Sequence, residues 1–462
     1  MKRNLILIVL CALLAAFYFW DTEREEKKQE QEIKEQTLVS LSQNEIKEIT
    51  ITRHDNVIKA VKEEEQWKLQ EPLQALGDAS NWNNIITTMA DGKMERVIEE
   101  NPTDLGKFGL VNPTLKVTLA GIGGATATTV IIGKETPVSG KYYAMVEGAS
   151  EVVTVLSYWQ NAVAKSLYDF RDKTVLNLDE TKVQKVGITD ASGTINLERQ
   201  GVDQWIATAP FQGRANESAI RDLITKVKNA KVKQFVDEKP DNLEMYGLIQ
   251  PATKLVFWSG DDPTASLAAQ TLLIGATNEY GHFYAKHEDK ANVFTIEAMD
   301  LEKIPEDAES LRMTKLLAIR SWEAREIKVT AGDQMILDAT KQEGNWELRA
   351  PQQGKADYNS MAEAVRAITD LEAETFAPPG MDFSSPALIL DVSSETKNET
   401  IRIVEQTGED GSKTYFAERL NPLEILQLSA SAIDGLRNKV QAVTLDHSAP
   451  VEEAEPSETE DS

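Results

Sequence analysis

The sequence predicts an α+β protein made of three tandem repeats of a mostly antiparallel β module with two helices each, preceded by one N-terminal transmembrane helix. Three observations predict this architecture. A tryptophan, a proline five residues later and a helix-capping Asp or Asn six residues further on recur three times. Each repeat opens with alternating apolar residues, and an apolar run follows two basic residues at the N-terminus.

The repeat is clearest where a strand ends and a helix begins. Trp67 and Trp205 are 138 residues apart, and Trp205 and Trp346 are 141 apart. Because these residue types pack cores and cap helices, we interpret them as structural repeat anchors and not as reacting groups. The anchors are Trp67, Pro72 and Asp78, then Trp205, Pro210 and Asn216, and then Trp346, Pro351 and Asp357.

Each module is expected to open with a hairpin followed by a helix. An alternating strand begins at Ile46, Val183 or Ala324, a turn follows, and a second strand leads to the tryptophan. The proline is expected to end strand pairing, and a capped amphipathic helix comes next. The apolar stripe of this helix is clearest in the second copy, at Ile220, Leu223, Ile224 and Val227.

A Gly-Leu signature opens the second half of the first two modules. The segment from Phe108 to Pro113 (Phe-Gly-Leu-Val-Asn-Pro) matches that from Tyr246 to Pro251 (Tyr-Gly-Leu-Ile-Gln-Pro). Hairpin-like strands follow, with a last helix ending near an arginine, and no parallel crossover is needed. The signature adds Gly109, Pro113, Gly247 and Pro251 to the anchors, and the closing arginines are Arg171, Arg312 and Arg437.

These marks divide the chain into six parts, and each module is large enough for its own core. No Gly/Ser-rich or Pro-rich linker separates the modules, so we expect neighbouring modules to touch. The third module lacks the Gly-Leu signature and is degenerate. The parts are a transmembrane anchor (1–20), a charged stalk (21–37), module 1 (38–176), module 2 (177–317), module 3 (318–445) and an acidic disordered tail (446–462).

The N-terminus predicts an uncleaved membrane anchor. Lys2 and Arg3 precede an apolar run from Leu5 to Trp20, which is near the short limit for a spanning helix. A signal peptide is the alternative, but the run ends in bulky aromatics where a peptidase prefers small residues. The positive-inside bias places the N-terminus in the cytoplasm. We therefore expect a single-pass protein of the bacterial inner membrane that contacts lipid through residues 5–20, with most of the chain in the periplasm.

Composition excludes several classes of function. The only cysteine, Cys11, lies inside the apolar run, so the rest of the chain has no disulfide and no thiolate chemistry. The net charge of −26 argues against nucleic acid as a partner, because phosphates would be repelled.

No catalytic, cofactor-binding or metal-binding residues are predicted. The glycines from Gly121 to Gly124 are expected to form a hairpin loop between two strands, where a dinucleotide fingerprint would need a strand and a helix. The four histidines are scattered, and no Gly-x-Ser-x-Gly elbow is present. Carboxylates are abundant, so a glycosidase-like pair stays open. The repeated tryptophans could stack on sugars, although their place before a proline and a cap favours core packing.

The chain resembles the family catalogued as domain of unknown function 4340. The resemblance is carried by the anchor, Trp-x4-Pro before a capped helix, (Phe/Tyr)-Gly-Leu-x-x-Pro, (Ile/Leu)-Ile-Gly and Tyr-Ala. The resemblance implies a membrane-anchored periplasmic protein, often encoded beside an ABC-type transport system of the gliding-motility kind. It carries no catalytic residues over, and it implies an accessory role.

These expectations lead to two functional hypotheses. The first is a non-enzymatic accessory protein that binds subunits of an ABC-type export or gliding-motility-like transport complex. The alternative is a protein that binds or hydrolyses envelope polysaccharide or peptidoglycan. An apolar patch shared by two modules would favour the first, and exposed carboxylates lining one cleft would favour the second. A structural spacer without a ligand is a third possibility.

Overall fold

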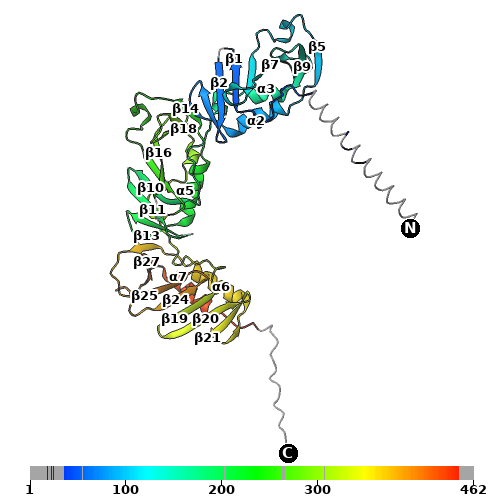
Figure 1. Cartoon of the computed structure of the whole chain (residues 1–462). Helices are drawn as coiled ribbons and strands as arrows, with labels where there is room; N and C mark the ends of the chain where they lie inside the picture. Colours follow the sequence, from blue (N-terminus) through cyan, green and yellow to red (C-terminus); the bar gives the residue numbers. More distant parts are fainter. Residues whose placement is uncertain are drawn as a thin grey trace, which may run out of the picture. The chain divides into compact units, whose positions relative to one another are not determined.

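The computed structural model describes residues 36–54, 56–201, 204–262, 266–305 and 307–446, together with Tyr18, Thr22 and Arg24. Contacts divide the chain into two compact units between Thr174 and Val175. The first unit holds one β-sheet and the second holds two (Figure 1). Each sheet has nine strands, so the prediction of mostly antiparallel β modules in three copies is confirmed.

Module 1 contains the first sheet and three α-helices. Its strands are β1 (Glu48–Arg53), β2 (Asn56–Glu63), β3 (Gln66–Glu71), β4 (Ala75–Leu76), β5 (Arg96–Glu100), β6 (Leu115–Ala120), β7 (Thr128–Glu135), β8 (Lys141–Val146) and β9 (Glu151–Leu156). Its helices are α2 (Ala79–Ala90), α3 (Ser157–Val163) and α4 (Leu167–Phe170), with 3₁₀ turns η1 (Gly106–Phe108) and η2 (Ile122–Gly124).

The described residues of module 2 contain the second sheet and one α-helix. Its strands are β10 (Val183–Asp190), β11 (Gly193–Arg199), β12 (Trp205–Ala209), β13 (Gly213–Arg214), β14 (Gln234–Asp237), β15 (Thr253–Ser259), β16 (Ala268–Thr277), β17 (Phe283–His287) and β18 (Val293–Ile296). Its helix is α5 (Glu217–Asn229), with 3₁₀ turns η3 (Glu244–Tyr246), η4 (Ala298–Asp300) and η5 (Glu309–Leu311).

Module 3 contains the third sheet and two α-helices. Its strands are β19 (Glu326–Ala331), β20 (Gln334–Gln342), β21 (Asn345–Ala350), β22 (Gly354–Lys355), β23 (Thr375–Ala377), β24 (Leu388–Ser393), β25 (Asn398–Thr407), β26 (Lys413–Arg419) and β27 (Glu424–Leu428). Its helices are α6 (Tyr358–Thr369) and α7 (Ala430–Gln441).

The three sheets share one topology. The order in module 1 is β4-β3-β2-β1-β6-β7-β8-β9-β5, and the corresponding strands follow the same order in modules 2 and 3. Neighbouring strands pair antiparallel throughout, for example Ile51 with Ile58 on one side and with Val117 on the other. The repeat read from the sequence is therefore a repeat of the whole sheet.

The opening of each module has one strand more than predicted. The tryptophan lies on the third strand, since β2 ends before a second turn and β3 then carries Trp67. Gly201 and Gly344 mark this turn in modules 2 and 3, where both adopt a positive φ. The proline does not end pairing either, because the short strands β4, β13 and β22 fold back onto β3, β12 and β21.

The first helix of each module starts as predicted. The side chains of Asp78, Asn216 and Asp357 accept hydrogen bonds from backbone N–H groups in the first turns of α2, α5 and α6. The second helix is present as α3 in module 1 and α7 in module 3. In module 2 the described residues at this place form the turns η4 and η5, and Pro305 between them cannot donate a helical hydrogen bond.

Each sheet has a large core on its helix side and a smaller one on its other face. In module 1, Ile132 and Val153 belong to the large core, whereas their neighbours Ile131 and Val152 belong to the small one. The small core is covered by the loop that carries the Gly-Leu signature, through Phe108. The loop is therefore part of the sheet's second layer.

The two ends of each module are tied together by backbone hydrogen bonds. In module 2, the N–H of Asn216 donates to Leu311 O (2.7 Å), and the N–H of Met313 donates to Arg214 O (2.9 Å). Equivalent bridges join Gly77 to Arg171 and Ala356 to Leu445. Leu445 is thus the third counterpart of Arg171 and Arg312, and Arg437, which was expected there, lies inside α7.

No helix among the described residues is long and apolar enough to cross a membrane. The expected anchor at 1–20 lies outside those residues except for Tyr18, as do most of the stalk at 21–37 and the tail beyond Asp446.

Candidate functional site

The repeated tryptophans are placed in or against the large cores. Trp67 and Trp205 are buried, and Trp346 is half-buried against the core of module 3. The ring of Trp67 stacks on Trp82 with centroids 5.6 Å apart, and its Nε1 donates to Asn83. The structure thus gives these rings packing roles, and the sugar-stacking reading of them does not fit their burial.

The other repeat anchors lie in turns. Pro72, Pro210 and Pro351 each follow a cis peptide bond at the reversal between two paired strands. Gly109 and Gly247 have φ values of 72° and 67°, which favour glycine. A Cβ on Gly247 would lie 2.7 Å from the amide nitrogen of Ala276, so the loop approaches the sheet too closely for a side chain. Pro113 and Pro251 are half-buried after these loops.

The Gly-Leu loops also hold an apolar side chain in solvent at the same place in two modules. Phe108 and Leu110 point into the small core of module 1, and Tyr246 and Leu248 do so in module 2. The next residues, Val111 and Ile249, are 61% and 63% exposed. In module 3, Phe383 fills the small core although the glycine and leucine are missing. The exposed residue of each loop is a candidate docking contact on its own module.

A cluster of charged side chains is buried where modules 2 and 3 meet, and we call it the seam cluster. It consists of Arg214 and Arg312 from module 2 with Glu399, Arg419 and Glu424 from module 3. Glu424 accepts from Arg419 (2.5 Å), from the backbone N–H of Arg214 (2.9 Å) and from Arg312 (3.3 Å). Glu399 pairs with the guanidinium of Arg214. Burial lowers the pKa of Arg419, and the adjacent Glu424 opposes that shift.

Arg312 joins the two modules through aromatic rings as well. Its guanidinium carbon lies 4.4 Å from the ring centroid of Phe211 in module 2 and 3.5 Å from that of Phe376 in module 3. A cation that is held between two rings and paired with a buried carboxylate contributes more than an exposed one. The two modules therefore form a continuous unit, as expected for modules without a linker.

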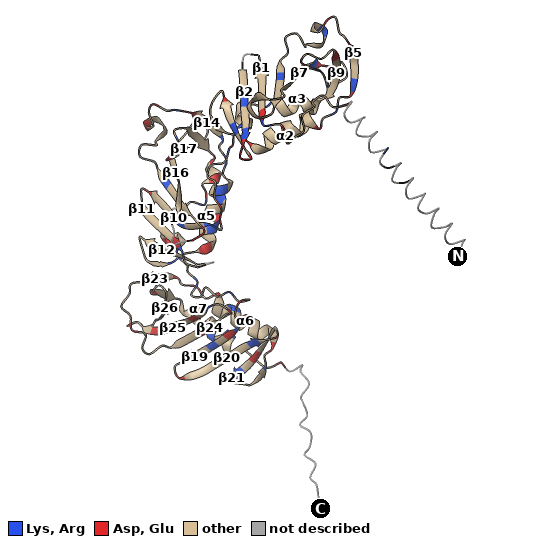
Figure 2. Cartoon of the chain, viewed as in Figure 1, with Lys and Arg blue, Asp and Glu red and all other residues tan. Residues whose placement is uncertain are grey.

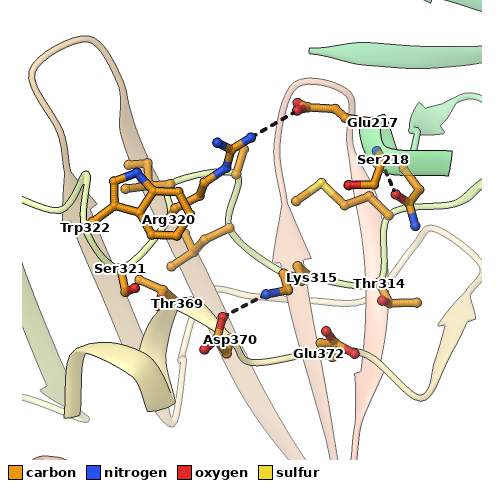
Figure 3. Close-up of a pocket in the computed structure, with 15 residues that line it drawn as sticks. Glu217, Ser218, Thr314, Lys315, Arg320, Ser321, Trp322, Thr369, Asp370 and Glu372 are labelled. Carbon is orange, nitrogen blue, oxygen red and sulfur yellow. Dashed lines mark hydrogen bonds and ion pairs between the residues drawn. The ribbon is translucent and has the colours of Figure 1, made fainter. Parts of the chain in front are cut away.

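A pocket of about 390 Å³ opens beside the seam cluster, and we call it the seam pocket (Figure 3). It is lined by the start of α5, the segment 313–322 and the end of α6. Trp322, 65% exposed, stands at its edge with Arg320 5.4 Å from its ring. Lys315 pairs with Asp370 at 2.7 Å, and Arg320 faces Glu217 at 3.9 Å.

The seam cluster holds one wall of this pocket. Arg419 donates to the carbonyl oxygens of Met313 (2.9 Å) and Lys315 (2.5 Å). Glu399 accepts from the backbone N–H groups of Ala318 (2.7 Å) and Ile319 (3.2 Å). Buried charges thus fix the backbone on which the pocket side chains stand, and such support is what keeps a binding site in one geometry.

The glycine-rich turn and His287 have structural surroundings. The glycines from Gly121 to Gly124 lie in the turn between β6 and β7, as expected. His287 packs against Phe294, and burial lowers its pKa to about 4. In the described part of the chain, no three His, Cys, Asp or Glu side chains are grouped so that they could hold a metal ion. Acidic and basic residues occur on all three modules (Figure 2).

The sequence indicated the Gly-Leu loops but not the seam cluster. Four of the five cluster residues carry no local motif, and the fifth, Arg312, was predicted only as a closing arginine. Arg214 and Glu399 are 185 residues apart. Comparison with known proteins gives one match, to the family described as Domain of unknown function (DUF4340), over residues 67–237 and 205–392. No curated protein and no solved structure matches the chain.

Proposed function

The chain belongs to the DUF4340 family, and from this membership we propose that it is a non-enzymatic accessory protein anchored in the bacterial inner membrane. In this proposal, its modules lie in the periplasm and bind protein subunits of an ABC-type export or gliding-motility-like transport complex. The N-terminal apolar run supports the anchor. The family resemblance supports the choice of partner.

The observation that carries the proposal is the repeated exposure of Val111 and Ile249. Both residues follow a buried Leu that packs the loop against the sheet. A rigid loop that holds an apolar residue in water offers a preorganised contact, because little conformational freedom is lost when a partner covers it. Met245, 70% exposed, adds apolar surface to the same loop of module 2. Each loop thus offers its own exposed apolar surface, one in module 1 and one in module 2, and this supports partner binding.

Two modest contacts on one tethered chain are sufficient for stable association. Each loop buries only a small apolar area, so neither alone is expected to bind tightly. A chain fixed in the same membrane as its partner searches a small volume, and the second contact then forms at high effective concentration. The proposal therefore predicts that binding depends on both loops and on the anchor.

The test is a cross-linking pull-down of the full-length protein from native membranes, with co-purifying chains identified by mass spectrometry. The wild-type protein is expected to recover ATPase or membrane subunits of an ABC-type complex. The double variant Val111→Glu with Ile249→Glu is expected to lose most of that recovery, because a buried unpaired charge opposes docking. Deletion of residues 1–20 should lower the recovery as well.

Ile122→Glu is the matched control. Ile122 is 81% exposed in the β6–β7 turn of module 1, outside the Gly-Leu loop. The control variant should recover transport subunits as the wild type does. Recovery of no transport subunit by the wild type would overturn the choice of partner, and equal recovery by the double variant would overturn the docking contacts.

A further inference from the structure

The seam pocket carries a second inference, independent of the Gly-Leu loops. We infer that this pocket binds a neutral oligosaccharide, with a sugar ring stacked on Trp322 and its hydroxyl groups bonded to the paired side chains of Lys315, Asp370, Arg320 and Glu217. The volume of about 390 Å³ falls within the ~300–1,000 Å³ that is usual for small-molecule sites.

The pocket lining has one aromatic ring, that of Trp322. Leu317 and Ile319 belong to the pocket lining, but their side chains are buried in the core of module 3. Trp322 is 65% exposed, whereas Met313, the remaining large apolar residue of the lining, is half-buried. A peptide ligand anchors itself through several apolar pockets or through a free strand edge. One open indole beside polar groups suits a sugar ring, whose faces carry C–H groups and whose rim carries hydroxyls.

The charges of the pocket suit a ligand without charge. Lys315 is paired with Asp370, and Arg320 faces Glu217, so the field of each group is largely cancelled by its neighbour. Glu372 adds one further negative charge to the lining. An anionic ligand would be repelled, and the described residues offer no metal-binding group of three. Paired charged groups still form strong hydrogen bonds. A sugar hydroxyl can donate one to a carboxylate and accept one from Lys or Arg.

The support of the pocket wall makes the arrangement a built site. The backbone from Met313 to Ile319 is bonded at four points by Arg419 and Glu399. Lys315 stands on this supported segment, and Arg320 follows it directly (Figure 3). Preorganisation of this kind lowers the cost of binding a small ligand.

The test is isothermal titration calorimetry of the full-length protein with maltotetraose, cellotetraose and chitotetraose. The protein is held in a zwitterionic detergent without a sugar headgroup, because glycoside detergents would compete. Saturable binding of at least one saccharide is expected. Trp322→Ala should raise its Kd at least about tenfold, and Lys315→Met should raise it by a smaller factor. Both side chains are exposed enough for the variants to fold.

Tyr358→Ala is the matched control, since Tyr358 is an aromatic residue of module 3 that is 80% exposed and outside the pocket lining. Its Kd should equal that of the wild type. The inference is overturned if none of the three saccharides binds at millimolar concentration, or if Trp322→Ala binds as tightly as the wild type. Binding of an uncharged extended peptide in place of the saccharides would also overturn it.

Discussion

The guanidinium of Arg419 and the carboxylate of Glu424 are 2.5 Å apart, and both side chains are withdrawn from water. Glu424 also accepts from two groups of module 2, the backbone N–H of Arg214 and the side chain of Arg312. One carboxylate of module 3 therefore satisfies donors of both modules, and its removal would leave buried donors without a partner.

Glu424→Gln is expected to destabilise the seam by about 3–5 kcal/mol, because it leaves Arg419 as a buried charge without its carboxylate. Hydrogen exchange followed by mass spectrometry should show faster exchange at 313–320. The double variant with Arg419→Met should recover part of the loss. Glu418→Gln, which affects a partly exposed pair with Arg402, is the control and should cost under about 1 kcal/mol. Equal exchange in both single variants would contradict the prediction.

Gly213→Ala is expected to open the same seam by steric contact. A Cβ at this position would lie 2.2 Å from Oε1 of Glu424. The carboxylate cannot move away cheaply, because three donors hold it. We expect faster hydrogen exchange at 313–320 and a lower urea midpoint of the second unit. Gly435→Ala, with open space around the added methyl group, should leave exchange at 313–320 unchanged. Wild-type hydrogen exchange in the Gly213→Ala protein would contradict the prediction, because it would show that Glu424 can move away from the added methyl group.

The three tryptophans are expected to differ in their contribution to stability. Trp67→Ala and Trp205→Ala each remove a buried ring and should lower the free energy of unfolding by about 3–5 kcal/mol. Trp346→Ala should cost less, because that ring is only half-buried. Urea unfolding measures the total loss, and hydrogen exchange assigns it to a module. Equal losses from all three, or losses spread over every module, would contradict this prediction.

Acidification is expected to lower the stability of the fold, because His287 is half-buried in its neutral form. The pKa of this histidine is about 4 in the folded chain, mainly because of burial, against an ordinary value of 6.5. Between these values the unfolded chain binds the proton more readily, so acidification favours unfolding; above about 6.5 the group has no effect. The urea midpoint should decline less between pH 6.5 and 4.5 in His287→Gln than in the wild type. His282→Gln is the control, and identical profiles for all three proteins would contradict the assignment.

Much of the fold could be predicted because it is encoded locally. The caps Asp78, Asn216 and Asp357 bond within four residues of themselves, and the alternating strands show their faces directly. The extra strand was missed because its turn has a glycine in two copies but Glu64 and Glu65 in the first. The missing second helix of module 2 could have been inferred from Pro305.

The seam could not be predicted because its residues resemble ordinary surface residues. Arg214, Glu399 and Glu424 are charged residues of a strongly acidic chain, and most charged residues are solvated. They are buried because two modules dock against each other. This contact joins positions about 200 residues apart, and the repeat pattern of the sequence gives no sign of it. Trp322 could not be predicted because it lies outside the repeated Trp-x4-Pro pattern.

The hydrogen bonds that close each module set the order in which a growing chain can fold. The first strand of module 2 begins at Val183, yet the carbonyl oxygen of Arg214 receives its hydrogen-bond donor only when Met313 has been synthesised. Met313 also presents its carbonyl oxygen to Arg419 of the next module. The residue that completes one module is thus a template for its successor. Synthesis from the N-terminus would therefore complete module 2 before module 3 docks against it.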